Sequence, residues 1–146
     1  MNLEQDIVTV RPAETVDTIQ KLPNYVGISE QTAGAKGISM NIVVIPPGAK
    51  AEPHFHDGFE TAIYLIQGNV QTFYGENLAK SVTNQQGDFI FIPEGVPHQP
   101  VNLSNTEAAI ALVARNDPNE QESVQVYRGH DPAVPSQSAD SLSTPA

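Results

Sequence analysis

Two of the four histidines in the chain lie two residues apart, in the stretch PHFHDGFE at residues 53 to 60. Successive side chains of a β-strand point to opposite faces, so in a strand His54 and His56 would face the same way, about 7 Å apart. Two imidazoles on one face can share a metal ion. Glu60 follows the turn-forming pair Asp57-Gly58 and can bring a carboxylate to the same centre. This short segment therefore offers three candidate metal ligands.

A third histidine, His98, lies in the later stretch GDFIFIPEGVPHQPVN at residues 87 to 102. The rigid Pro-Glu-Gly-Val-Pro turn before it fixes the direction of its side chain. Each candidate has an ordinary alternative when taken singly. A His-X-His pair is often solvated surface, a histidine after a proline turn is more often structural, and most glutamates are solvated. The joint pattern favours one shared metal site.

The elements that must position these residues are short strands. From residue 38 on, apolar or alternating runs end repeatedly in turns rich in Gly, Pro or Asn, which is typical of strands. Strands are predicted at residues 38 to 45, 60 to 67, 70 to 74, 87 to 92 and 107 to 114. Gly68-Asn69 suits a tight hairpin turn, and one short helix is allowed at residues 13 to 22. The pattern predicts an all-β fold, an antiparallel barrel or sandwich.

Two stretches carry a resemblance to a known family. GAKAEPHFHDGFETAIYLIQG, residues 48 to 68, resembles the first motif of the cupin family: Gly, five residues, His-X-His, three or four residues, Glu, and about six residues to a Gly. Residues 87 to 102 resemble the second motif: Gly, five residues, Pro-X-Gly, two residues, His, three residues, Asn. Glu60 departs from the pattern, because seven residues separate it from Gly68, and the strand after it is expected to carry a bulge or a longer turn.

The resemblance covers roughly residues 38 to 116 and implies an antiparallel double-stranded β-helix, or jelly-roll barrel, of the single-domain RmlC-like kind. It also implies one divalent transition metal per chain, bound by His54, His56, Glu60 and His98. Three neutral imidazoles and one carboxylate suit Fe, Mn, Ni, Cu, Co or Zn and argue against Ca and Mg, which prefer oxygen ligands. Because histidine must be neutral to bind, metal affinity is expected to weaken as the pH falls through about 6.

The chain divides into three predicted parts. Residues 1–37 form an extension that packs on the barrel or swaps with it, residues 38–130 form the barrel, and residues 131–146 form a disordered tail rich in Pro and Ser. The resemblance makes a homodimer the expected assembly, in which the stretch DIVTVRP at residues 6 to 12 adds a strand across the interface.

Four further residues have less specific roles. Tyr64 shares strand parity with the predicted ligand Glu60 and faces the barrel interior if no bulge intervenes, although it is equally compatible with a core aromatic. Asn102 is expected to brace a turn through hydrogen bonds to the backbone. Arg115 could reach a carboxylate substrate, although a solvated arginine at a strand end is the more common case. His130 is interpreted as unrelated to the site.

Two functions from different classes follow. The first is a metalloenzyme acting on a small oxygenated metabolite, of the dioxygenase, isomerase, decarboxylase or lyase type. The second is a noncatalytic barrel in which the metal helps to bind or sense a small molecule, since a fold does not settle a function. An open metal position, which four protein ligands leave in an octahedral shell, favours the enzyme.

Composition excludes several other classes. Seventeen acidic residues against seven basic ones give a net charge of -10 and an isoelectric point near 4.6, which disfavours nucleic acid and anionic membrane surfaces as partners. The absence of cysteine excludes disulfides and thiolate metal sites. The first twelve residues carry Glu4 and Asp6 where a signal peptide needs positive charge, and the longest apolar run, residues 108 to 114, is far below the roughly 20 residues of a membrane span. A cytoplasmic location is expected.

Overall fold

The structure is a computed structural model that describes residues 1–12, 16–17, 22–119 and 124–129 of the chain. Strands dominate this part, and its helices are short. The elements are β1 (Val16–Asp17), β2 (Pro23–Ile28), α1 (Glu30–Ala33), β3 (Ser39–Ile45), β4 (His54–His56), β5 (Thr61–Gln67), β6 (Asn69–Tyr74), the 3-10 turn η1 (Glu76–Leu78), β7 (Lys80–Gln85), β8 (Phe89–Ile92), β9 (His98–Asn102), β10 (Ala109–Arg115) and β11 (Val124–Val126).

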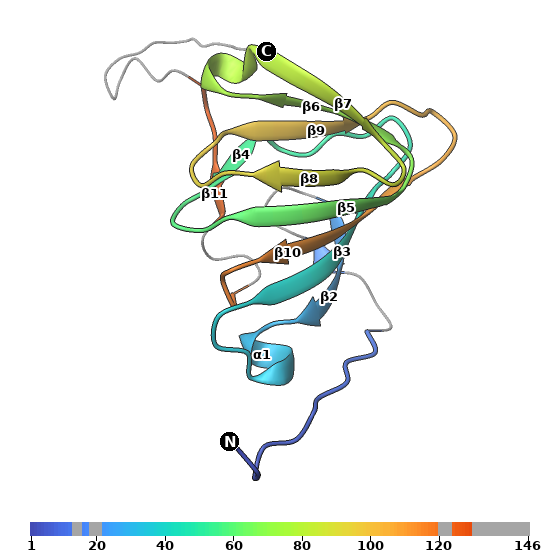
Figure 1. Cartoon of the computed structure of the whole chain (residues 1–146). Coiled ribbons are helices and arrows are strands. Elements are labelled where there is room, and N and C mark those ends of the chain that lie inside the picture. The colour runs from blue at the N-terminus through green and yellow to red at the C-terminus, as the bar shows by residue number, and fades with distance from the viewer. Residues whose placement is uncertain (13–15, 18–21, 120–123, 130–146) are drawn as a thin grey trace.

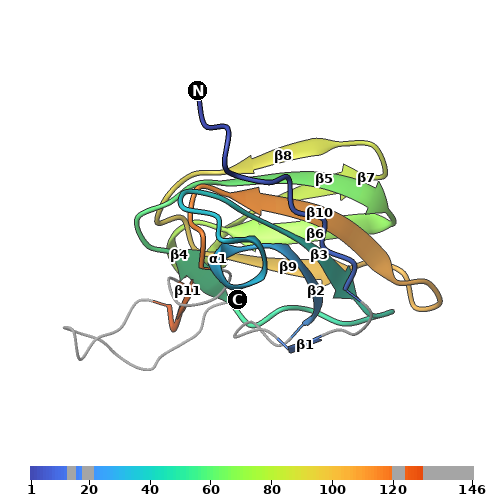
Figure 2. The ribbon, with the colours of Figure 1, turned by 90° about the horizontal axis from the view of Figure 1, so that it is seen from below.

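The strands form two antiparallel sheets. The first has the order β1-β2-β3-β10-β5-β8 and the second has the order β11-β4-β9-β6-β7. In the view of Figure 2, β5 and β10 lie on one side of the interior, and β4 and β9 lie on the other. Figure 1 shows the strands of the first sheet side by side, with α1 below them. The predicted all-β antiparallel jelly-roll barrel is confirmed.

The interior between the sheets is apolar at one end and polar at the other. Along the pair of β3 and β10, Ala109 lies opposite Ile45 at the apolar end, and Arg115 lies opposite Ser39 at the polar end. Alternate residues of both strands are buried, as the period of two in a strand requires. The buried apolar cluster comprises Leu22, Val43, Ile45, Ala51, Leu65, Val70, Ala109, Ala111 and Val113. A ligand inside the barrel would therefore meet polar groups mainly at the Arg115 end.

The turn predicted at Gly68-Asn69 exists, but it does not make a hairpin. β5 and β6 lie in different sheets, so Gly68 carries the chain from one sheet to the other. Its φ of 102° and an added Cβ only 2.9 Å from Ala109 both require glycine. The bulge expected before this turn is confirmed at Ile66, because Leu65 and Gln67 pair with consecutive residues of β10.

Other predictions near the chain ends have mixed outcomes. The helix allowed at residues 13 to 22 is wrong at Val16–Asp17, which form β1 and pair with β2. β2 itself lies within the predicted extension and pairs with β3 as part of the first sheet. The predicted tail at residues 131–146 and His130 lie outside the described residues. Within the described part, no helix is long and apolar enough to cross a membrane.

Asn102 has the bracing role predicted for it. Its buried Nδ2 donates to the backbone carbonyls of Ile45, Pro46 and Glu107, and its Oδ1 accepts from the amide of Ser104. One side chain thereby ties the end of β9 to the loop after β3 and to the segment before β10.

We predict that Asn102→Ala lowers the free energy of unfolding by about 2 to 3 kcal/mol, because buried carbonyls lose their donor. Urea unfolding of metal-free protein would measure this. The exposed Asn105 provides the control, and Asn105→Ala should change stability by less than about 0.5 kcal/mol. Equal effects of the two substitutions would contradict the bracing role.

Candidate metal centre

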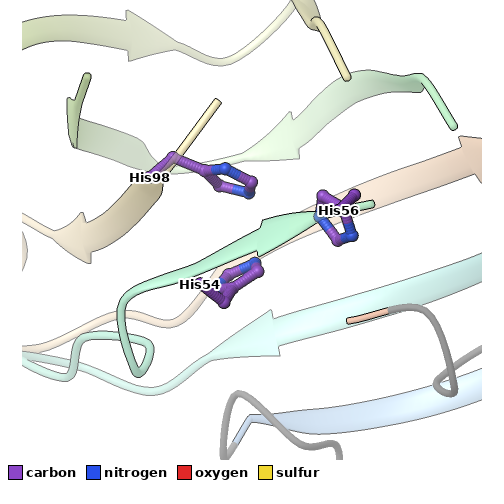
Figure 3. A group of neighbouring side chains, drawn as sticks. All are labelled: His54, His56 and His98. Carbon is purple, nitrogen blue, oxygen red and sulfur yellow. The ribbon is translucent and has the colours of Figure 1, made fainter. Parts of the chain in front are cut away.

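Three of the predicted ligands lie together inside the barrel. His54 and His56 are the ends of β4, and His98 is the first residue of β9. β4 pairs with β9 at a single position, His54 opposite His98. The three ring centroids are 4.3 to 5.1 Å apart, and all three side chains are buried. Figure 3 shows the rings close together, two from β4 and one from β9.

The turn before His98 is fastened to the strand that carries the other two histidines. Gly95, in the predicted Pro-Glu-Gly-Val-Pro turn, has a φ of 74° and donates its amide hydrogen to the carbonyl of His56 over 2.8 Å. The turn therefore sets the position of His98 relative to β4 directly, through a backbone hydrogen bond.

Hydrogen bonds determine which ring nitrogens are free. Nδ1 of His54 lies 2.7 Å from the carbonyl of Glu52, and Nδ1 of His98 lies 2.8 Å from the carbonyl of Val96. A carbonyl only accepts, so each Nδ1 carries the proton and each Nε2 keeps a free lone pair. Nδ1 of His56 is buried without a hydrogen-bond partner in the described structure. Backbone carbonyls that orient imidazoles in this way are a common second layer around metal sites.

Burial keeps the three imidazoles uncharged. It lowers the pKa of His54 to about 3, that of His56 to about 2 and that of His98 to about 4, from an ordinary value of 6.5. The neighbouring positive charge of Arg115 lowers all three pKa values further. All three side chains are therefore neutral at physiological pH, which is the form that binds metal.

The cluster fits a transition metal ion. One ligand atom from each histidine can be chosen so that all three lie within 4.8 Å of one another. Imidazole nitrogens bind such ions at about 2.0 to 2.1 Å, so modest side-chain rotation would bring three of them onto one ion. The unpartnered Nδ1 of His56 agrees with a ring whose partner is a metal or a ligand.

Glu60, the predicted fourth ligand, lies outside this group. Its side chain is exposed, and its amide donates to Oδ1 of Asn116 over 2.8 Å. The next residue, Thr61, begins β5 on the inner face and is 2% exposed. Since successive strand residues alternate faces, Glu60 is directed away from the histidines. The structure therefore gives no support to Glu60 as a ligand.

Tyr64 follows the same parity and also lies on the outer face. Its ring packs against Phe89, with centroids 4.8 Å apart, and Phe89 is 84% exposed. The interior position predicted for Tyr64 assumed that Glu60 faces inward and that no bulge lies between the two residues. The bulge in β5 does come after Tyr64, but Glu60 faces outward, so the prediction for Tyr64 is wrong. Its inner-face neighbours Ile63 and Leu65 line the cavity instead.

The cavity beside the histidines has a volume of about 80 Å³ and is lined mostly by aliphatic side chains. Thr61 and Arg115 line it as well, and they are direct cross-strand neighbours in the pairing of β5 with β10. Arg115 is 6% exposed, so the solvated arginine considered from the sequence is not what the structure shows. A cation at this position can act on a ligand bound near the histidines.

Comparison with known proteins agrees with this architecture. The family model for the cupin domain matches residues 41–114, and the chain belongs to the cupin family. Germin-like protein subfamily T member 3 of Arabidopsis thaliana is 33% identical over 104 residues, which is 69% of this chain and 46% of that protein.

Solved oxalate decarboxylases share the fold. The Lactobacillus farciminis enzyme in complex with formate has a TM-score of 0.65 at 25% identity, over 79% of this chain and 33% of its own. The Bacillus subtilis enzyme, described with Mn(II) centres, has a TM-score of 0.66 at 20% identity, over 79% and 30%. This chain thus spans about half the germin-like relative and a third of these enzymes. Family membership and the histidine cluster together support a divalent metal.

The family spacing explains the departure at Glu60. With four residues after His-X-His and six before Gly68, the pattern places its acidic residue at position 61, which holds Thr61 in this chain. The sequence therefore has a threonine at the inward-facing position and its glutamate one residue early, on the outer face. Counting back from Gly68 would have identified this, whereas the burial of Arg115 has no comparable signal in the sequence.

We predict that metal-free protein loses stability as the pH falls below about 6.5. Above this pH each imidazole is neutral in both the folded and the unfolded chain. Below it the histidines of the unfolded chain bind protons, whereas the buried histidines of the folded chain stay neutral because their pKa values are lowered. The free energy of unfolding therefore falls toward pH 4. Thermal melts in chelator between pH 7.5 and 4.5 would measure this.

The control for that experiment is His56→Gln, which removes one of these groups and leaves the carboxylates in place. Its melting temperature should fall less steeply with acid than that of the parent. Parallel profiles would show that the buried histidines do not govern the acid response.

Proposed function

We propose that this chain is a metal-dependent cupin enzyme acting on a small oxygenated metabolite. The observation that carries the proposal is the convergence of His54, His56 and His98, neutral and buried, at the wall of a small cavity. An ion held by three side chains keeps coordination positions open for a second ligand, which is the arrangement of catalytic rather than structural sites.

The chain's own residues have separable tasks. The histidines hold the ion, and the aliphatic lining limits access of water to it. A bound Fe, Mn, Ni, Cu, Co or Zn ion supplies Lewis acidity or, for the redox-active metals, electron transfer. Dioxygenase, isomerase, decarboxylase and lyase reactions are all compatible with this arrangement, and the oxalate decarboxylase relatives support the decarboxylase type among them.

We predict close to one divalent transition ion per chain, measured by elemental analysis of protein purified without chelator or affinity tag. His98→Ala should weaken metal affinity by more than about tenfold, because one of three ligands is lost. Glu60→Gln is the matched control and should leave stoichiometry and affinity unchanged, since Glu60 is exposed outside the group. Equal losses in both variants would contradict the three-histidine site, and a wild-type chain without metal after reconstitution would overturn the proposed function.

The second candidate function is a noncatalytic cupin that binds or senses a small molecule. The small volume of the cavity is compatible with it as well. Product analysis of metal-loaded protein with a panel of small oxygenated compounds separates the two functions. Oxygen consumption is measured first if the metal is Fe or Cu, and isomerase, decarboxylase and lyase assays come first for the other metals. Saturable binding without turnover across the panel would favour the sensor.

A homodimer is part of the proposal, and the outer face of the first sheet supports it. Two rows of apolar side chains cross this face, as the strand registers place them opposite one another. One row is Phe89, Tyr64, Leu112, Ile42 and Tyr25, and the other is Phe91, Ala62, Ala114, Met40 and Ile28. A sheet that is apolar on both faces is typical of one covered on both. A second copy of the chain would cover it.

We predict a particle mass near twice the 15.7 kDa of one chain, measured by light scattering. Phe89→Glu with Phe91→Glu should reduce it to the mass of one chain, because both side chains are exposed on the proposed interface. Val82→Glu, an exposed apolar position in the other sheet, is the control and should leave the dimer intact. An unchanged dimer in the double variant would exclude this face.

The first twelve residues extend away from the sheets, with Leu3 and Ile7 exposed (Figure 1). Their proposed role as a strand across the dimer interface is tested by removing them. A dimer of unchanged stability after removal of residues 1–12 would exclude this segment from the interface.

The net charge of -10 supports the further proposal that neither nucleic acid nor an anionic membrane is a partner.

A further inference from the structure

Arg115 is a buried cation for which the described residues form no salt bridge. It is the last residue of β10, its side chain is 6% exposed, and its Nε is buried without a hydrogen-bond partner in the described structure. Burial lowers the pKa of Arg115 to about 10, and the charge of the half-buried Asp117 opposes this only in part. A buried guanidinium with an unused donor lowers the stability of the fold unless a ligand accepts its hydrogen bond and balances its charge.

The lining of the cavity, as far as the structure describes it, offers no negative charge to balance Arg115. None of the described residues that line it is acidic, and its polar groups are the three histidines, Thr61, Thr72 and Arg115. The histidines are neutral, so a divalent ion on them would keep its full charge of about +2. Together with Arg115 the site would carry about three positive charges in an apolar enclosure. Such a site favours a negatively charged ligand over a neutral one.

Thr61 adds a second unused group at the same place. Its Oγ1 is buried without a hydrogen-bond partner in the described structure, and it lies directly across the strand pair from Arg115. Side chains in such a pair stand about 4.5 to 5.5 Å apart at Cβ, close enough for both to contact one ligand. A hydroxyl and a guanidinium are both donors to a carboxylate, and the planar guanidinium matches its two oxygens.

The volume of the cavity sets the size of that ligand. At about 80 Å³ it is well below the roughly 300 Å³ and more of sites for drug-sized ligands. A ligand of a few non-hydrogen atoms fits. The aliphatic lining, with Ile63, Leu65 and Val113 among its members, strengthens polar contacts by excluding water.

We propose that the cavity binds a small carboxylate between the metal held by the three histidines and the guanidinium of Arg115, with the Thr61 hydroxyl as a further contact. Arg115 is thereby the residue that selects an anionic substrate over a neutral one. This inference rests on the proposed function, because it requires a metal at the histidines.

The test uses full-length protein reconstituted with Co(II), whose visible absorption reports changes in its ligands. Acetate is titrated as the probe and acetamide as its neutral counterpart of the same size. We expect saturable spectral changes with acetate and none with acetamide over the same concentrations. Arg115→Gln should weaken acetate binding at least tenfold while cobalt content stays near that of the parent. Arg115→Lys keeps the charge but not the planar guanidinium, so its acetate affinity should lie between those of the parent and of Arg115→Gln.

The matched control is Lys36→Gln, which removes one positive charge at an exposed position outside the cavity lining and should leave acetate affinity unchanged. Equal acetate affinity in the parent and in Arg115→Gln would overturn the inference, as would binding of acetamide as tight as that of acetate. If the parent binds cobalt in those cases, the proposed metal-dependent function is not contradicted. A parent that binds neither cobalt nor any of the other five candidate ions overturns both.

A second variant decides the matter if Arg115→Gln does not fold. Thr61→Glu places a carboxylate beside Arg115, at the position where the family pattern has its acidic residue. We expect cobalt affinity to rise, and acetate affinity to fall at least tenfold because the internal carboxylate takes the place of the ligand. Unchanged acetate binding in this variant would overturn the inference.

Discussion

The histidine cluster depends on the contact of β4 with β9, where His54 lies opposite His98. β4 has three residues, and its two ends both face the interior, so pairing at this single position brings all three imidazoles together. The hydrogen bond from Gly95 to His56 fastens the approach to β9 from the other side. Packing the three imidazole rings together removes their hydration. Because the charged form loses more than the neutral form, the pKa values of the three histidines fall and the rings stay neutral. A neutral, buried set of nitrogens is in turn what a divalent ion requires.

The charge balance of the interior follows from a shift of one residue. Had the glutamate stood at position 61, a carboxylate would lie beside Arg115 and offset both it and a bound ion. With Thr61 in that place and Glu60 on the outer face, the positive groups inside have no internal counterion among the lining residues that the structure describes. In the proposed function, a ligand that enters the cavity would supply the missing negative charge.

The two faces of the first sheet serve different purposes. Its inner face carries most of the apolar cluster at one end and Thr61 and Arg115 at the other, so it contributes both stability and the wall of the cavity. Its outer face is also apolar, with Phe89 and Phe91 prominently exposed in a single chain. Both faces belong to the same strands, so a partner that covers the outer face would also restrain the strands that carry Thr61 and Arg115.

The amino-acid sequence by itself determined the family, the all-β fold and the three histidines of the cluster. His-X-His in a strand fixes a shared direction, the Pro-Glu-Gly-Val-Pro turn orients His98, and the glycine turns mark the strand ends, all of which are local properties. The tertiary structure decided which face Glu60 and Tyr64 occupy, and it showed that Arg115 is buried rather than solvated. The reason is that side chains in a strand alternate with a period of two, so a single residue of register reverses every direction. That register is set by pairing with distant strands such as β10, and the spacing from Glu60 to Gly68 is a local trace of it in the sequence.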